Sequence, residues 1–176
     1  MKRCDIYRVT TPIAWAIYTN HPDGRPESFE STIDDPNNPS TKGTKSYTKY
    51  FYDPISKMCV KIESTSLNLT TTMEFTYANG RITRMLTTTS VAWTESLFEY
   101  EGTKMVKRTD QLNMPLVGAY FLPVVSTYSY NSDGTLDKIT TLEQGTNASS
   151  TVKYTWENGK VPADCEYLWT FLAIFG

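Results

Sequence analysis

The stretch that decides the fold is FTYANGRIT, from Phe75 to Thr83. Aromatic and β-branched residues, which are typical of strands, lie here on both sides of the pair Asn79-Gly80. An Asn-Gly pair can take the two positive φ angles that a type I′ hairpin turn requires. The stretch therefore predicts a β-hairpin with a two-residue loop, in which Thr76 faces Thr83 across the strands.

The same unit, an aromatic residue followed by a polar turn and then a basic or aliphatic residue, recurs along the chain. Its key aromatic residues are Tyr52, Tyr77, Tyr100, Tyr130 and Trp156, at intervals of 25, 23, 30 and 26 residues. An interval of this size corresponds to one hairpin and its connection, so the sequence predicts an array of hairpins.

Turn residues accompany these copies. The pair Asn158-Gly159 repeats the Asn-Gly signal, and Glu101-Gly102 is a weaker form of it. With Glu101-Gly102 as the loop, we expect Glu99 to face Lys104. A type I turn closed by a glycine with positive φ fits two longer segments, His21–Gly24 and Asn131–Gly134.

About twelve strands joined in chain order follow from these turns. We therefore predict an all-β fold, an antiparallel meander of about six hairpins forming a strongly curved or partly closed sheet. The prediction is a single β domain over residues 1–176, with an exposed loop over 34–44 and hairpin repeats over 46–165. The apolar segment Met114–Val125, which has a proline near each end, is expected to plug or cross one face of the sheet.

Composition excludes several classes of protein. Lys and Arg number 17 against 19 Asp and Glu, and the net charge of −2 argues against a nucleic-acid partner. Twelve tyrosines and 27 threonines favour strands over a helical bundle. A single histidine argues against multi-histidine metal sites. The spacing of Cys4, Cys59 and Cys165 predicts isolated thiols, with one pairing of Cys59 and Cys165 as the alternative.

The sequence predicts no transmembrane helix, because no apolar run reaches the roughly 18 residues that such a helix needs. The first residues, Met1 to Asp5, carry positive charge without the apolar stretch that follows in a signal peptide. Two readings stay open: a protein that remains inside the cell, or a mature form with a replacement methionine.

The repeated unit resembles the YD repeat of RHS-type proteins and the YD-like hairpins of exported Bacteroidetes lipoproteins of unknown function. The nearest match is Asn79-Gly80-Arg81-Ile82 after Tyr77, followed by Asp133–Leu136 after Tyr130. The resemblance covers roughly residues 46 to 165. It implies a curved sheet of hairpins and an extracytoplasmic location, in the periplasm or at the cell surface, and it supplies no catalytic residues.

From this resemblance we expect a non-catalytic binding or structural module of a bacterial cell envelope, without a cofactor. The partner classes are carbohydrate, an apolar small molecule or another envelope protein, with an edge-strand dimer through Ile6–Val9 as a further expectation. The speculative ligand-binding residues are Tyr52, Tyr77, Tyr100, Tyr130 and Trp156. These aromatic residues form either an exposed row that stacks on sugars or apolar chains, or a ladder in the core. Asp34, Asp35 and Asn37 offer oxygen ligands of the kind that Ca²⁺ prefers.

Two other functions stay open. One is a closed carrier of an apolar ligand, with a cavity lined by Met73, Phe75, Tyr77 and Ile82 and with Met114–Val125 as its lid. The other is a hydrolase that uses paired carboxylates, which would need two acids with opposed pKa shifts in one cleft. Acids scattered over turn tips, where Asp53 and Asp133 are predicted to lie, would argue against that hydrolase.

Overall fold

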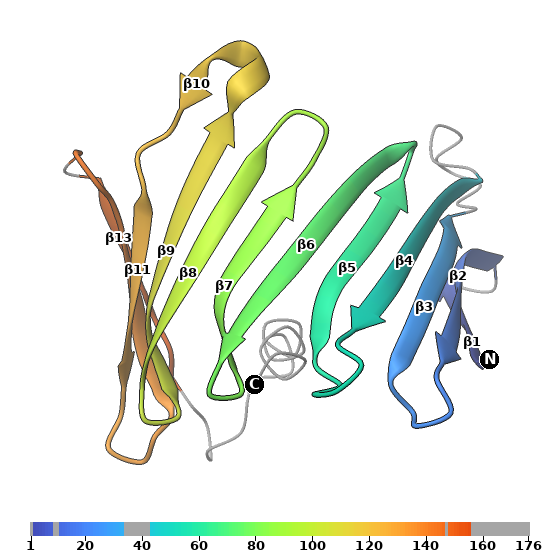
Figure 1. The fold of residues 1–176 in the computed structure, drawn as a ribbon, viewed down its shortest axis with the longest axis horizontal. Helices are drawn as coiled ribbons and strands as arrows, with labels where there is room; N and C mark the ends of the chain where they lie inside the picture. Colours follow the sequence, from blue (N-terminus) through green and yellow to red (C-terminus); the bar gives the residue numbers. More distant parts are fainter. Residues whose placement is uncertain (1, 9–10, 34–42, 147, 156–176) are drawn as a thin grey trace. The chain divides into compact units, whose positions relative to one another are not determined.

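The computed structural model describes residues 2–8, 11–33, 43–146 and 148–155. In these residues thirteen strands follow one another in chain order, and neighbours in the order are hydrogen-bonded, except that β10 pairs with β9 to one side of the path (Figure 1). The strands are β1 (Lys2–Arg8), β2 (Thr11–Asn20), β3 (Pro26–Ile33), β4 (Thr44–Tyr52), β5 (Cys59–Ser66), β6 (Leu69–Ala78), β7 (Arg81–Thr88), β8 (Trp93–Glu101), β9 (Lys104–Met114), β10 (Ala119–Tyr120), β11 (Val124–Tyr130), β12 (Leu136–Glu143) and β13 (Ser149–Lys153).

The predicted all-β antiparallel meander of hairpins is therefore confirmed. The sheet is not closed in the described residues, since β1 and β13 are the two ends of its strand order. Its strong curvature stays a prediction. Contacts divide the chain into two compact units, and each is described by itself below. Unit 1 is Met1–Glu74 with Thr87–Ser90, and unit 2 is Phe75–Leu86 with Val91–Gly176. The prediction of a single domain stays a prediction.

In unit 1, side chains on β4 alternate between exposed and half-buried from Thr44 to Lys49. This alternation reflects the two-residue period of a strand, which sends successive side chains to opposite faces. On the half-buried face, hydroxyls pair across β4 and β5: Ser46 Oγ lies 3.0 Å from Ser66 Oγ. Cross-strand hydroxyl pairs of this kind contribute to the stability of a sheet.

The two turns of unit 1 that follow β2 and β4 are held by short local hydrogen bonds. The His21–Gly24 turn has the predicted form: Gly24 has a φ of 87° and its N–H donates to His21 O at 2.9 Å. The turn after Tyr52 has no glycine. There Asp53 Oδ1 accepts the N–H groups of Ile55 at 3.0 Å and Ser56 at 2.6 Å. An aspartate that binds backbone N–H groups in this way can close a turn in place of glycine.

A further turn of unit 1, between β5 and β6, was not predicted. Leu67 and Asn68 form it with φ angles of 51° and 63°, and Ser66 pairs with Leu69 across it. Two positive φ angles are those of a type I′ turn, here without any glycine. The absence of the glycine signal explains why the sequence pattern did not reveal it.

In unit 2, the hairpin quoted from the sequence is confirmed. Asn79 and Gly80 have φ angles of 53° and 76°, as a type I′ turn requires. Thr83 Oγ1 donates to Thr76 O at 3.4 Å, which brings these two residues together as expected. The predicted glycine-closed turn after β11 is also present, because Gly134 has a φ of 90° and its N–H donates to Asn131 O.

The predicted register of the β8–β9 hairpin is wrong. Glu101 belongs to β8 and pairs directly with Lys104, so the two loop residues are Gly102 and Thr103. Gly102 takes a φ of 56° at the first loop position, a placement typical of a type II′ turn. A further register shift lies between Glu99 and Tyr100, so Glu99 faces Lys107 rather than Lys104, and their side chains form an ion pair of 2.7 Å.

Few apolar side chains of the described residues are buried. Among large ones in unit 2, Phe75, Ile82 and Met85 are only 5 to 8 % exposed. Polar contacts fill part of the interior instead: Ser96 is fully buried and its hydroxyl donates to Asp110 at 2.5 Å. The buried Ser96 hydroxyl is tolerated because it has this hydrogen-bond partner.

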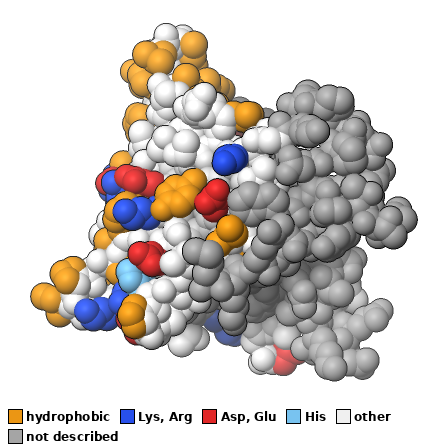
Figure 2. All heavy atoms as spheres, turned by 90° about the vertical axis from the view of Figure 1, so that its right-hand side faces the viewer, with side chains coloured by type: hydrophobic (Ala, Val, Ile, Leu, Met, Phe, Trp, Pro, Cys, Tyr) orange, Lys and Arg blue, Asp and Glu red, His pale blue; other side chains and the backbone are white. Residues whose placement is uncertain are grey.

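The segment Met114–Val125 does not cover a face of the sheet, contrary to the expectation. It forms the end of β9, a short 3-10 helix (η1, Pro115–Val117), β10 and the connection to β11. Leu116 is 73 % exposed and Tyr120 is 77 % exposed. Figure 2 shows hydrophobic side chains gathered at the top of the molecule, the end at which Figure 1 places β10.

None of the helices among the described residues has the length and apolar character needed to cross a membrane.

Candidate functional site

Three of the predicted aromatic residues hold successive hairpins together. Each lies just before a turn, is half-buried, and donates its hydroxyl to a backbone carbonyl of the preceding hairpin. The three hydrogen bonds are Tyr52 to Pro26 O at 2.7 Å, Tyr100 to Ile82 O at 2.9 Å and Tyr130 to Met105 O at 2.7 Å. A net contribution of about 1 kcal/mol is typical of each such bond.

A cation lies over each of these three rings. In each case the cationic residue directly precedes, in sequence, the residue whose carbonyl accepts the tyrosine hydroxyl. It follows the turn glycine of the preceding hairpin by one or two residues. The pairs are Arg25 over Tyr52 at 4.4 Å, Arg81 over Tyr100 at 5.5 Å and Lys104 over Tyr130 at 5.1 Å from the ring centroid. We call each set of tyrosine, cation and carbonyl a tyrosine clamp. The clamp explains why a glycine-cation pair and a tyrosine recur together in the sequence.

Burial extends the pH range over which the clamp tyrosines stay protonated. It raises the pKa of Tyr52 to about 12, and it also raises the pKa of Tyr100 and of Tyr130. A protonated hydroxyl is needed for donation to a carbonyl. In these three residues the hydroxyl and one ring face are thus already engaged within the protein, which favours a structural role.

The other two predicted aromatic residues, Tyr77 and Trp156, are not assigned to a clamp here. Tyr77 is half-buried near the end of β6, in unit 2 with Tyr100 and Tyr130, whereas Tyr52 belongs to unit 1. Trp156 lies outside the described residues. A ligand-binding role for the five aromatic residues stays a prediction.

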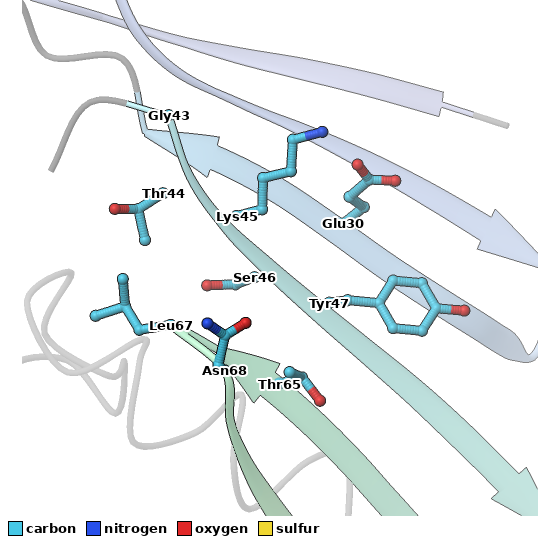
Figure 3. Close-up of a pocket in the computed structure, with 9 residues that line it drawn as sticks. All are labelled: Glu30, Gly43, Thr44, Lys45, Ser46, Tyr47, Thr65, Leu67 and Asn68. Carbon is cyan, nitrogen blue, oxygen red and sulfur yellow. The ribbon is translucent and has the colours of Figure 1, made fainter.

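A different surface of unit 1 has the features of a binding site. Glu30 on β3, Tyr47 on β4 and Thr65 on β5 are direct cross-strand neighbours and form one row on one face. They border a hollow of about 710 Å³ (Figure 3). Its lining consists of Glu30, Gly43, Thr44, Lys45, Ser46, Tyr47, Thr65, Leu67 and Asn68. We call this surface the Tyr47 hollow.

The Tyr47 hollow combines an aromatic ring with several kinds of polar group. Tyr47 is 45 % exposed, and the row places it between the Glu30 carboxylate and the Thr65 hydroxyl. Thr65 Oγ1 lies 3.0 Å from Thr70 Oγ1, so its position is supported from the next strand. Figure 3 shows the ends of Lys45 and Glu30 on the same side of the hollow. A charged pair, hydroxyls and a ring can together bind a polar ligand that also has an apolar face.

Sequence reasoning missed Tyr47 because it lies outside the repeated aromatic position. The signal that could have found it is the alternation of Lys45, Tyr47 and Lys49, which places all three on the exposed face of β4. The Thr44 end of the predicted loop over 34–44 belongs to β4 and borders the Tyr47 hollow. Residues 34–42 of that loop lie outside the described residues.

A second hollow, of about 340 Å³, surrounds the clamp of Tyr52. Arg25 in its wall is bound to Asp23 at 2.5 Å, and His21 meets the Tyr52 ring edge-on at 5.7 Å between centroids. The groups here bind one another, so this hollow is a weaker candidate than the Tyr47 hollow. Neither hollow is lined by Met73, Phe75, Tyr77 or Ile82, the residues predicted for a carrier cavity.

Three carboxylates with a lowered pKa lie at turns. A hydrogen bond from Arg25 lowers the pKa of Asp23, and one from the Ser56 backbone N–H lowers the pKa of Asp53. A hydrogen bond from Thr135 lowers the pKa of Asp133. All three pKa values shift in the same direction, whereas an acid and base pair in a hydrolase needs opposed shifts. These three acids therefore act as turn residues.

The predicted metal ligands Asp34, Asp35 and Asn37 lie outside the described residues. Within the part of the chain that the structure describes, no group of three or more His, Cys, Asp or Glu side chains could hold a metal ion. Comparison of the sequence with protein-family models and with curated proteins found no match.

Proposed function

We propose that this protein is a non-catalytic carbohydrate-binding module of a bacterial cell envelope, and that the Tyr47 hollow is its binding surface. The row of Glu30, Tyr47 and Thr65 across three strands of unit 1 is the observation that carries the proposal. The envelope location rests on the resemblance of the hairpin units to YD repeats.

The chemistry of the row fits a sugar. A pyranose ring has an apolar C–H face, which stacks on an exposed aromatic ring, and a rim of hydroxyls that need donors and acceptors. Tyr47 offers the ring, the Glu30 carboxylate accepts hydroxyl protons, and Lys45 and Asn68 donate N–H groups. Because strands hold the row, little order has to be gained on binding.

Isothermal titration of the full chain with soluble fragments of envelope polysaccharides tests this proposal. We expect binding that Tyr47→Ala weakens by roughly tenfold, since stacking on an aromatic ring contributes about 1 kcal/mol or more. Glu30→Gln keeps the shape of the row and removes its charge, and it should weaken binding by a smaller factor.

Tyr18→Ala is the matched control, because Tyr18 lies on another strand of unit 1 and has nearly the same exposure, 46 % against 45 % for Tyr47. This variant should bind like the wild type. The proposal fails if no polysaccharide fragment binds, or if Tyr47→Ala and Tyr18→Ala bind with the affinity of the wild type.

A further inference from the structure

Unit 2 has an exposed apolar segment between β9 and β11, which we call the apolar tip. Its members come from η1, β10 and the connection that follows: Leu116, Val117, Tyr120, Phe121 and Leu122, which are 73, 68, 77, 45 and 48 % exposed. A soluble protein rarely exposes so many large apolar side chains within one short segment unless they contact a partner or a membrane.

The η1 end of the apolar tip lies past the neighbouring strands of unit 2, whereas Tyr120, which pairs with Asn113, is level with Trp93 of β8. Pairing of β8 with β9 stops at Trp93 and Asn113, and pairing of β11 with β9 stops at Val124 and Asp110. Beyond these points β9 is paired with the two residues of β10. Leu116 and Val117 therefore lie on a protruding turn of unit 2, and Tyr120 to Leu122 continue the apolar surface back along β9.

The apolar tip has no formal charge. From Gln111 to Ser132 the sequence contains no Asp, Glu, Lys, Arg or His. The acid that precedes this run, Asp110, is bound by Arg108 at 2.8 Å and by the Ser96 hydroxyl. The tip thus carries no charged group that would have to be desolvated or matched by a polar partner.

Much of the backbone in the apolar tip is already hydrogen-bonded. The N–H of Gly118 donates to Pro115 O at 3.1 Å, and the N–H of Phe121 donates to Leu112 O at 3.4 Å. Gln111 Nε2 donates to Phe121 O. Prolines at both ends, Pro115 and Pro123, have no N–H group at all.

These observations point to one kind of occupant. We propose that the apolar tip inserts shallowly into a lipid surface. An uncharged tip with much of its backbone already hydrogen-bonded suits a lipid surface, in which unsatisfied N–H and C=O groups are costly. Tyr120 and Phe121 are of the aromatic type that collects at membrane interfaces, and the Tyr120 hydroxyl can remain at the level of the headgroups.

Sedimentation of the full chain with uncharged phosphatidylcholine vesicles tests the proposal. We expect the wild type to bind, and the affinity to change by less than about twofold between 0.1 and 0.5 M NaCl, because the tip has no charges to screen. The double variant Leu116→Asp/Val117→Asp should bind at least about tenfold more weakly, since loss of burial of even one such side chain is worth that factor. Both side chains are mostly exposed, so circular dichroism should show an intact fold.

The matched control is Ile55→Asp, which changes an apolar residue that is 90 % exposed at a turn of unit 1 and should leave vesicle binding unchanged. A wild type that does not sediment with vesicles, or a double variant that binds like the wild type, would overturn the proposal. A dimer in size-exclusion chromatography that the double variant dissociates, without vesicle binding, would assign the apolar tip to a second copy of the chain instead.

Discussion

Tyr52, Tyr100 and Tyr130 show how one residue type can define a repeat. Each combines a ring that accepts a cation with a hydroxyl that reaches a carbonyl of the preceding hairpin. A phenylalanine would retain the ring and lose the bond to the carbonyl, whereas a leucine would lose both. The recurrence of tyrosine at this position follows from these two contacts.

Removal of one clamp hydroxyl should lower the stability of the fold. Tyr130→Phe leaves the Met105 carbonyl without its 2.7 Å partner, and we expect the free energy of unfolding to fall by about 1 kcal/mol. Urea denaturation followed by circular dichroism measures this change. Tyr120→Phe, at a position 77 % exposed, is the control and should change stability by less than about 0.5 kcal/mol. Equal effects of the two substitutions would show that the clamp hydroxyl contributes nothing.

Alkaline pH should weaken the fold through the same residues. Burial raises the pKa of Tyr52 from 10.0 to about 12, so the unfolded chain loses this proton first as the pH rises. Its contribution is fully present below pH 10 and is lost as the pH approaches 12. Urea midpoints measured at intervals from pH 9 upward should fall more steeply for the wild type than for Tyr52→Phe. Parallel curves for the two proteins would contradict this assignment.

At the scale of the element, glycine turns were the most predictable feature. Asn79-Gly80 was placed correctly because an Asn-Gly pair fits a type I′ turn. Glu101-Gly102 was placed one residue too early, since Gly102 occupies the first loop position and not the second. A lone glycine can occupy either the first or the second position of a two-residue loop. Which register forms depends on the residue pairs that face each other across β8 and β9.

The turn at Leu67 and Asn68 was missed for a physical reason that can be tested. Leu67 holds a φ of 51°, a conformation that costs a residue with a Cβ roughly 1–2 kcal/mol and that asparagine tolerates better. Leu67→Asn should therefore raise the free energy of unfolding by about 0.5 kcal/mol or more. Thermal and urea unfolding measure the gain. The same change at exposed Ile55 should give no gain, and a loss of stability in Leu67→Asn would show that the leucine side chain packs usefully.

At the scale of the whole molecule, chain order was predictable because each hairpin is closed by a short local turn. Sequence neighbours thereby become neighbours in the strand order. The sequence did not predict the Tyr47 hollow, because its exposure depends on which face of β4 other residues cover. It did not predict the apolar tip either, because the exposure of the tip depends on where the strands beside β9 end. Both units contain a tyrosine clamp, in the form of Tyr52 in unit 1 and Tyr100 and Tyr130 in unit 2.

Contacts that join only adjacent hairpins give a fold whose stability resembles that of repeat proteins, a sum of units and of the interfaces between neighbours. Few apolar side chains are buried in the described residues, so the clamps provide an important part of those interfaces. The central claim is that, in the three clamps of the described residues, the tyrosine of one hairpin binds the glycine-cation turn of the preceding hairpin and stabilises it.

A double-mutant cycle between Lys104 and Tyr130 tests that claim most directly. Lys104→Met keeps the aliphatic stem and removes the charge that lies 5.1 Å from the ring centroid, and Tyr130→Leu removes the ring. Unfolding free energies of the wild type, the two single variants and the double variant give the coupling between the two side chains. We predict a favourable coupling of about 0.5–1 kcal/mol, and a coupling indistinguishable from zero would contradict the account.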